Sequence, residues 1–169
     1  MQVTISDYPA PTILETLKRN TSTNLPPELL QSVARIEGHQ WGQLDTEFAL
    51  QNAGHYTRIL AADCLWMPHE HHNLAKSMLH FLSSDPAAGV FVIAGFHKGR
   101  RMLAPFFMEV VPKEGLEVEE IWEMDADGVR REWAAEKDEE PVGERKKWVV
   151  VARLRRKGGD GVRHDIPFH

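Results

Sequence analysis

The chain has 169 residues, of which 42% are hydrophobic and 27% are charged, and this composition is ordinary for one globular domain with its own core. No apolar run is long enough for a membrane-spanning helix, and no basic segment followed by an apolar one comes after Met1, so the sequence favours neither membrane insertion nor secretion. A formal net charge of −5 argues against tight, non-specific binding to nucleic acids, which depends on neutralising phosphates. The single cysteine, Cys64, excludes an intrachain disulfide, and its apolar surroundings predict a buried thiol in a reducing compartment, the cytosol or the nucleus.

The first elements predicted in chain order are a strand and a helix. β-Branched residues at positions 3–5 predict a short strand that ends at Asp7. After a proline-rich turn, apolar residues recur at helical spacing, and they predict a helix that ends at Asn20 before a polar run. An irregular stretch begins at Pro26, and alternating residues 32–37 predict a second short strand.

The middle of the chain alternates between strands and helices. Residues 43–54 are predicted to form a loop with one helical turn. The nearly continuous apolar run over residues 56–62 is typical of a strand that is covered on both faces. A helix with one buried face is predicted from residue 68 to residue 82, and residues 89–95 form the clearest buried strand in the sequence.

The last third is predicted to contain one helix and two strands. The helix covers residues 102–113, and Pro105 requires that it begin near that position or bend there. The strands cover residues 116–122 and 147–154. Between them, the charged segment 125–145 is predicted to be an exposed excursion.

This order of elements predicts an α/β fold, with a Rossmann-like, mostly parallel, twisted sheet that ends in an antiparallel C-terminal strand pair. One domain is predicted over residues 1–157, and residues 158–169 have too little apolar content to order themselves. Ligands of such sheets bind beyond the carboxyl ends of the strands, where Asp7, Trp41 and Asp63 fall. A carboxylate at the end of a strand suits the ribose hydroxyls of a nucleotide cofactor.

Each of these side chains also has a purely structural interpretation. Asp7 suits a cap for the turn that follows it, and Trp41 suits a core position. Asp63 suits the start of the next helix, with Trp66 filling the space beside it. Both interpretations stay open on the residues alone, and the functional one gains weight only because all three positions fall at one edge.

Three charged clusters complete the inventory. The run His69-Glu70-His71-His72 lacks the spacing of a zinc-protease motif and favours the first turn of a helix, so no metal site is predicted. The run His97-Lys98-Gly99-Arg100-Arg101 lies on the ligand edge and suits either a solvated loop or a contact with an acidic substrate. Phe96 and His97 are candidates for a substrate pocket. The basic run over residues 153–157 is interpreted as a solvated strand end.

Three motifs in this order resemble the seven-strand, S-adenosylmethionine-dependent methyltransferases of the small lysine-methyltransferase group. The fungal members of this group are often called nicotinamide N-methyltransferase-like. The resemblance extends from Met1 to about Leu154, and the motifs that carry it are Thr4-Ile5-Ser6-Asp7-Tyr8-Pro9, Glu37-Gly38-His39-Gln40-Trp41-Gly42 and Ile59-Leu60-Ala61-Ala62-Asp63-Cys64-Leu65-Trp66.

The resemblance implies a role for each motif. Asp7 matches the acidic residue that hydrogen-bonds the ribose of S-adenosylmethionine, and Trp41 matches the aromatic residue beside the adenine. Asp63 and Trp66 match the family's Asp-x-x-Tyr element, which lines the pocket for the methyl acceptor and touches the cofactor, although here Trp replaces Tyr. The implied reaction is N-methylation of an amine on a protein or a small molecule, with Asp63 and Trp66 positioning the amine.

The sequence departs from the family at its beginning. In the family, a first strand and a Gly-rich turn precede the residues that match Met1 onward, and this sequence contains neither. We therefore expect weakened cofactor binding, because that turn supplies backbone donors to the cofactor. Three accounts stay open: a truncated gene model, a sheet that closes by pairing residues 3–7 with residues 56–62, and completion by a second copy or a partner protein. The alternative function is a non-catalytic binding or assembly module.

Overall fold

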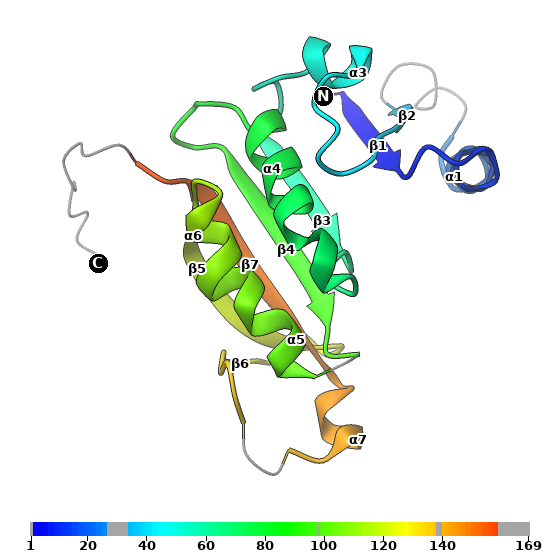
Figure 1. Ribbon diagram of the computed structural model, residues 1–169. Helices are drawn as coiled ribbons and strands as arrows, with labels where there is room; N and C mark the ends of the chain where they lie inside the picture. The colour runs from blue at the N-terminus through cyan, green and yellow to red at the C-terminus, as the bar shows by residue number, and fades with distance from the viewer. Residues whose placement is uncertain (1, 27–33, 98, 138–139, 159–169) are drawn as a thin grey trace.

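The strands of the chain lie in two separate sheets. The computed structural model describes residues 2–26, 34–97, 99–137 and 140–158. The first sheet pairs β1 (Val3–Asp7) and β2 (Ala34–Gly38) in parallel. The second has the order β3-β4-β7-β5-β6 (Figure 1).

The five-stranded sheet is mixed. β3 and β4 are parallel, β7 is antiparallel to β4, and β5 is antiparallel to both β7 and β6. The predicted α/β class with an antiparallel C-terminal pair is confirmed. The strands are β3 (Arg58–Ala62), β4 (Gly89–Gly95), β5 (Leu116–Asp125), β6 (Arg130–Glu132) and β7 (Trp148–Arg156).

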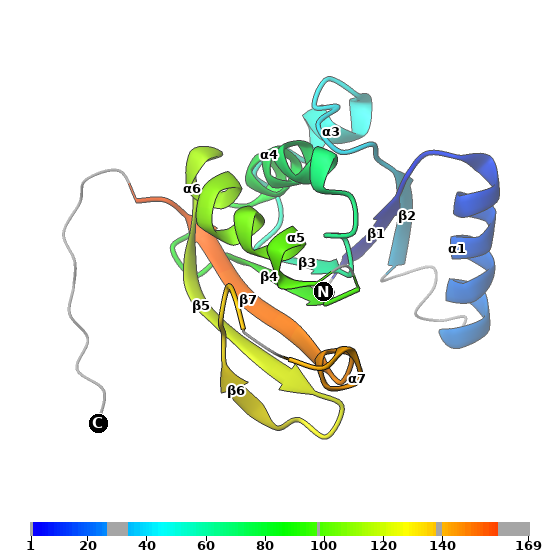
Figure 2. The same cartoon turned by 60° about the horizontal axis from the view of Figure 1, so that its bottom comes forward.

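The helices cover one face of this larger sheet. Figures 1 and 2 both place α4 and the stretch from α5 to α6 against the same face. Their apolar residues meet Val90, Val92, Val150 and Leu154 of the sheet in one core. The described helical segments are α1 (Pro11–Asn24), α3 (Glu47–Gln51), the 3₁₀ turn η1 (Pro68–Glu70), α4 (His71–Phe81), α5 (Arg100–Pro105), the π-helical segment η2 (Phe106–Val110), α6 (Val111–Lys113) and α7 (Val142–Arg145).

The first helix is longer than the sequence pattern predicts, since α1 continues to Asn24 instead of ending at Asn20. The hydroxyl of Thr21 donates to the carbonyl of Leu17 at 2.8 Å, and that of Thr23 donates to the carbonyl of Arg19 at 2.9 Å. Polar residues of this kind usually compete with helical backbone bonds, but here they bond back to the preceding turn. The predicted end was wrong for that reason.

The helix after β4 begins earlier than predicted and changes geometry within its length. It starts at Arg100 instead of Met102, and α5, η2 and α6 follow one another without a break to Lys113. The change to π-helical geometry comes directly after Pro105, which has no backbone N–H to donate. The wider turns place Phe106 and Phe107 in the core.

The charged segment after β5 is largely exposed, as its composition predicts, but parts of it pack against the rest of the fold. Its β6 pairs with β5, and Met124 lies opposite Arg130 in that pairing. Trp133 then folds back and stacks on Phe96, with ring centroids 6.0 Å apart. Arg131 and Glu140 of this segment form an ion pair, and the side chain of Glu140 is only 6% exposed, which the composition of the segment does not predict.

The basic run at the end of β7 is also more than a solvated strand end. Arg156 donates to three backbone carbonyls at the end of α4, including that of Leu79 at 2.6 Å and that of Ser83 at 3.3 Å. Arg155 is exposed and pairs with Glu117. Arg156 therefore caps a helix, whereas Arg155 remains in solvent.

The gap between the two sheets lies between β1 and β3. Among the described residues, β1 and β3 do not pair with each other. The account in which these two strands pair directly is therefore not the arrangement found. One side-chain bond crosses the gap, from the Tyr56 hydroxyl to the Thr4 hydroxyl at 2.9 Å. The predictions for residues 27, 32–33 and 159–169 lie outside the described residues. In the described part of the chain, no helix is long and apolar enough to cross a membrane.

Candidate functional site

Asp7 is the last residue of β1 and stands at the carboxyl edge of the smaller sheet. One carboxylate oxygen, Oδ1, accepts a hydrogen bond from the N–H of Tyr8 at 2.7 Å. Its backbone carbonyl accepts from the N–H of His39 at 2.8 Å, which joins β1 to the loop after β2. Asp7 therefore caps the turn, as its structural interpretation proposes, while the exposed carboxylate also remains open to a ligand.

Helix α4 holds the loop that carries Trp41. The Ser77 hydroxyl lies 2.9 Å from Nε2 of His39 and accepts from the N–H of Gly42 at 2.9 Å. Gly42 has φ +82°, and a Cβ there would lie 2.7 Å from Oδ1 of Asn73, so only glycine fits. Trp41 is half-buried and packs against the main core.

Sequence reasoning missed the two polar residues that fix this loop. Burial lowers the pKa of His39, and the neighbouring His80 lowers it further. The signal for Ser77 was present in the sequence, because it stands three residues after Leu74 and therefore on the buried face of the predicted helix. A serine at a core position needs a polar partner, and that partner is the loop.

Asp63 and His97 come together at the carboxyl ends of β3 and β4. Nε2 of His97 lies 3.1 Å from Oδ1 and 3.0 Å from Oδ2 of Asp63. Oδ1 also accepts from the N–H of Gly95 at 3.2 Å. Asp63 has φ +54°, a left-handed conformation that costs most residues free energy and is common at functional sites. Parallel strands have thus brought two residues 34 positions apart into one pair.

Gly95 makes room for this pair. A Cβ at residue 95 would lie 2.9 Å from Nε2 and 3.1 Å from Cε1 of His97. Since real Cβ contacts are longer than this, a side chain at residue 95 would displace the imidazole. The glycine at the end of β4 therefore sets where His97 stands.

A cavity of about 560 Å³ adjoins the Asp63–His97 pair. It is lined by Ala62, Asp63, Ile93, Ala94, Gly95, Phe96, His97, Lys146, Trp148 and Val149. Trp148 and Lys146 were not predicted. They reach this edge because β7 runs antiparallel to β4, with Val149 opposite Gly95. The available signal was an aromatic residue at the start of the last strand, with two lysines directly before it.

Two predicted site residues lie differently from what the motifs suggest. Trp66 is 51% exposed and is not among the residues that line the described cavity beside Asp63, so its role at the acceptor stays a prediction. Phe96 is 2% exposed. Its ring stacks on Trp133, and the guanidinium of Arg100 lies 4.4 Å from the Phe96 ring centroid and 5.9 Å from that of Trp133. Phe96 lines the cavity as part of the core.

The pKa of the half-buried Cys64 thiol depends on the charges around this edge. Burial first, and then the carboxylates of Asp7 and Asp63, raise this pKa to about 11. Both carboxylates therefore act on the same thiol, although they belong to different sheets. The ends of β1 and β3 face a common space.

The histidine-rich run at the start of α4 makes structural contacts. His71 is buried, its Nε2 lies 3.1 Å from the carbonyl oxygen of Leu65, and burial lowers its pKa. His72 pairs with Glu114 at 2.7 Å. His71 and His72 each have a partner of their own and join α4 to other parts of the fold.

Comparison with known proteins adds one family and one fold. A family model described as lysine methyltransferase matches residues 1–114. No curated protein matches the sequence. Solved structures with similar folds are known, at low sequence identity.

Three of these structures are methyltransferases by their descriptions. An S-adenosylmethionine-dependent methyltransferase from Methanosarcina mazei has 10% identity and a TM-score of 0.57, over 92% of this chain and 82% of that one. A putative sarcosine dimethylglycine methyltransferase from Galdieria sulphuraria has 8% identity and a TM-score of 0.56, over 92% and 69%. A putative methyltransferase from Thermoplasma acidophilum has 12% identity and a TM-score of 0.52, over 94% of this chain but only 58% of its own length. At these identities the likeness shows the fold.

Proposed function

The chain belongs to the lysine methyltransferase family, and on this premise we propose that it is an S-adenosylmethionine-dependent methyltransferase unit whose acceptor is an amine. The observation that carries the proposal is the Asp63–His97 pair, which stands beside a cavity of about 560 Å³ at the carboxyl ends of two parallel strands. This edge is where sheets of this class bind their ligands. The family match, residues 1–114, includes both members of the pair.

The residues present fit one end of the cofactor. The exposed carboxylate of Asp7 suits the ribose hydroxyls, and the half-buried ring of Trp41, in the loop that Ser77 holds, suits the adenine. The methionine end needs backbone N–H donors from a turn between β1 and β3, and the described residues place no strand there. We propose that a further segment completes this end, so the site in this chain is a partial one.

The acceptor half of the site performs positioning and proton removal. The cofactor, when bound, supplies an electrophilic methyl group on a sulfonium sulfur. Because an amine can accept a methyl group only as the neutral base, the protein would have to position the amine and receive the proton that its nitrogen gives up. Asp63 orients His97, and the imidazole accepts that proton and passes it to solvent. Both side chains are more than half exposed, which leaves a path for the proton.

The cavity walls suit a lysine side chain. Trp148 and Ile93 offer an apolar surface for the methylene groups, while the carboxylate of Asp63 attracts the amine. We place the chain with the group whose fungal members are called nicotinamide N-methyltransferase-like, because the Asp63-to-Trp66 element matches that group with Trp in place of Tyr. A protein amine and a small pyridine-like amine are the two acceptor classes.

A second candidate function is a binding or assembly module without catalysis. The separation of β1 and β3 favours it. In the described part of the chain, each of these strands is at the edge of its own sheet, and an unpaired strand edge invites pairing with another chain. In this version a second copy or a partner protein fills the gap between the sheets, and cofactor binding is lost.

Calorimetric titration with S-adenosylhomocysteine separates the two functions. Saturable binding that Asp7→Ala weakens at least tenfold is the result expected for a cofactor site, because the ribose loses its charged acceptor. The matched control is Asp127→Ala, which removes an exposed carboxylate from the β5–β6 turn. A folded chain that binds no cofactor supports the module.

The acceptor role is tested by Asp63→Asn in a chain that binds cofactor. Asparagine tolerates the left-handed backbone of residue 63, so this variant removes the charge while the turn is retained. Transfer of a radioactive methyl group to a lysine-containing peptide should fall at least tenfold in kcat, while the affinity for S-adenosylhomocysteine changes little. Unchanged turnover would rule out Asp63 as the positioning group.

A further inference from the structure

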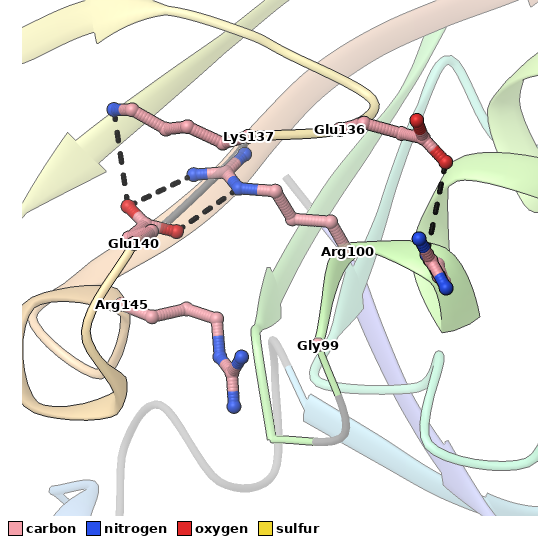
Figure 3. Close-up of a pocket in the computed structure, with 7 residues that line it drawn as sticks. Gly99, Arg100, Glu136, Lys137, Glu140 and Arg145 are labelled. Carbon is pink, nitrogen blue, oxygen red and sulfur yellow. Dashed lines mark hydrogen bonds and ion pairs between the residues drawn. The ribbon is translucent and has the colours of Figure 1, made fainter.

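A second cavity lies directly beside the proposed acceptor site. Its volume is about 230 Å³, and it opens between the start of α5, the segment after β6 and α7 (Figure 3). The residues that line it are Gly99, Arg100, Arg101, Glu136, Lys137, Glu140 and Arg145. Four of these seven are cationic, in a chain whose net charge is −5.

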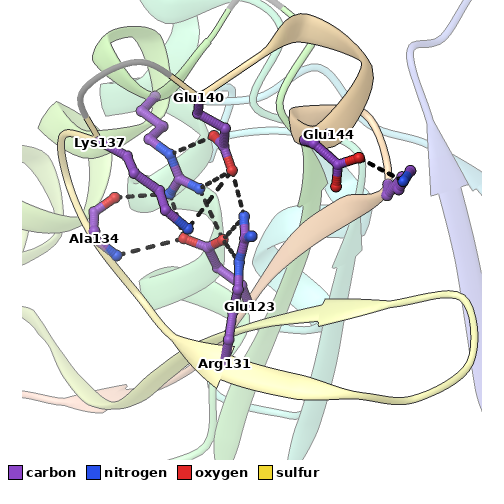
Figure 4. Close-up of polar contacts among 8 residues, drawn as sticks. Glu123, Arg131, Ala134, Lys137, Glu140 and Glu144 are labelled. Atoms are coloured by element: carbon purple, nitrogen blue, oxygen red, sulfur yellow. Dashed lines mark hydrogen bonds and ion pairs between the residues drawn. The ribbon is translucent and has the colours of Figure 1, made fainter.

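The buried charges at the base of this cavity are already matched. Arg100 is bonded to both Glu123 and Glu140, and Arg131 donates to the same two carboxylates at 2.7 Å and 2.6 Å (Figure 4). The side chains of Arg100, Glu123 and Glu140 are 5%, 1% and 6% exposed. Two guanidinium groups thus neutralise two carboxylates, and this network forms the floor.

The charges at the rim are not matched in the same way. Arg101 and Glu136 lie 3.7 Å apart and are 87% and 73% exposed, so their attraction is weak in water. Lys137 reaches only Glu140, at 3.8 Å, and that carboxylate already serves two arginines. Among the residues of the rim that the structure describes, positive charge is therefore in surplus.

Arg145 is the strongest part of this surplus. Within residues 99–137 and 140–158, as in the rest of the described chain, it makes no ion pair, and its Nε is buried without a hydrogen-bond partner. Its guanidinium lies against Gly99, where a Cβ would stand 3.6 Å from Nη1. Figure 3 shows the side chain extending from α7 toward Gly99. A planar cation held in this way is suited to bidentate recognition of a carboxylate.

The two cavities are lined by residues that are neighbours in the chain. Lys146 lines the acceptor cavity, and the preceding Arg145 lines the basic one. In the same way, His97 lines the acceptor cavity, and Gly99, two residues further along the chain, lines the basic one. Cα atoms two residues apart are separated by at most about 7.6 Å. An extended peptide advances about 3.3 Å per residue, so a side chain in the second cavity belongs to a residue about two or three positions from one in the first.

We propose that this basic cavity binds the carboxylate of an aspartate or glutamate that lies two or three residues from the acceptor lysine in a protein substrate. The inference rests on the proposed function for the position of the lysine, and it selects a protein acceptor with an acidic neighbour. A polyanion such as nucleic acid suits the site less, because the surrounding chain is acidic overall.

Peptide binding measured without cofactor tests the proposal independently of turnover. The probe is a short, fluorescein-labelled peptide with one lysine and a glutamate two residues away, compared by anisotropy with the same peptide carrying glutamine. The full chain should bind the glutamate peptide about tenfold more tightly, and Arg145→Gln should bring the ratio close to one. Arg145→Lys keeps the charge without the planar fork and should give an intermediate ratio.

The matched control is Arg130→Gln on β6, which removes an exposed arginine outside the cavity and should leave the tenfold ratio in place. Equal affinity for both peptides, or no binding of either, would overturn the proposal. So would single-stranded DNA that displaces the peptide and loses its own affinity in Arg145→Gln, because the ligand would then be nucleic acid. A preserved glutamate preference in a chain that transfers no methyl group leaves this inference standing while the proposed function fails.

Discussion

Glu123 is fully buried on β5 although it carries a charge, and the free energy of this arrangement depends on its partners. A buried carboxylate without a cation is strongly unfavourable, but Arg100 and Arg131 both donate to it. Burial by itself raises the pKa of Glu123, yet the hydrogen bonds from the two arginines outweigh it and hold that pKa below its usual value of 4.5. The pKa of Glu140 is lowered in the same way.

The sign of the pH dependence follows from these shifts. A carboxyl whose pKa is lower in the folded state stabilises the fold above the unfolded pKa, and this contribution is lost as the pH falls through the folded value. The loss therefore begins below about pH 4.5. His39 and His71, whose pKa values burial also lowers, give an earlier loss of stability as the pH falls below 6.5.

We predict that Glu123→Gln lowers the free energy of unfolding at pH 7 by about 3–5 kcal/mol, because two guanidinium groups lose a charged partner. In the variant, the free energy of unfolding should also fall less steeply below pH 4.5, while its histidine-dependent fall below pH 6.5 should remain. Urea unfolding between pH 3 and pH 7 measures both effects. The exposed Glu132→Gln on β6 is the control and should change stability by less than about 0.5 kcal/mol.

The residues of the site were predictable to different degrees. Asp7, Asp63 and His97 each follow a strand, and strand ends can be recognised in a sequence because apolar runs stop there. Trp148 and Arg145 could not be found in that way, because their place depends on β7 returning antiparallel beside β4. Such pairings join distant segments and leave no local pattern.

At the scale of elements, the end of α4 is held by a strand far away in sequence. The last carbonyls of a helix have no partners within it, and Arg156 of β7 supplies donors to those of Leu79 and Leu82. Arg156 thereby ties one helix to the edge of the sheet that the helix covers. The neighbouring Arg155 points to solvent and offers a comparison on the same strand.

We predict that Arg156→Ala lowers the free energy of unfolding by about 1–3 kcal/mol, the range for hydrogen bonds that involve a charged group. Arg155→Ala should cost less than about 1 kcal/mol, because its ion pair with Glu117 is exposed. Thermal unfolding followed by circular dichroism measures both variants. Equal losses in the two variants would show that the contacts of Arg156 with α4 carry no special stabilisation.

Another element of the fold shows why boundaries are hard to predict. Pro105 correctly signals an irregularity in the helix after β4, but the helix neither starts there nor bends into two. It begins at Arg100, whose side chain is fixed by Glu123 and Glu140, and continues through a π-helical segment. Tertiary contacts at the first residue outweighed the local preference.

At the scale of the molecule, the two sheets differ in how many buried hydrophobic residues they contribute to the core. Both hydrophobic clusters are built from residues after β2, and the described residues of α1 include only one buried side chain, that of Thr21. The smaller sheet is joined to the rest mainly by polar contacts such as Tyr56 with Thr4 and Ser77 with the loop of His39. Little buried apolar surface therefore becomes exposed to water when β1, β2 and α1 open.

We predict that β1, β2 and α1 open locally at a lower free energy than the five-stranded sheet does. Backbone amides of β1 should exchange with solvent deuterium at least tenfold faster than those of β4, because an edge strand with little buried area opens more easily. Hydrogen exchange measured by mass spectrometry on the full chain gives both rates. Similar protection in the two sheets would mean that contacts across the gap stabilise β1 as strongly as a paired strand would.

The sequence by itself determined the α/β class, the family resemblance and the strand ends where Asp7, Asp63 and His97 stand, because apolar periodicity and strand-end residues are local properties of a chain. Only the tertiary structure decided that Asp63 and His97 form a pair, that the charged side chains of Arg100, Glu123 and Glu140 bury one another, and that β1 and β3 stay in separate sheets. These outcomes depend on which distant segments meet, and on the free energy of matching charges and hydrogen bonds there, which no local pattern encodes.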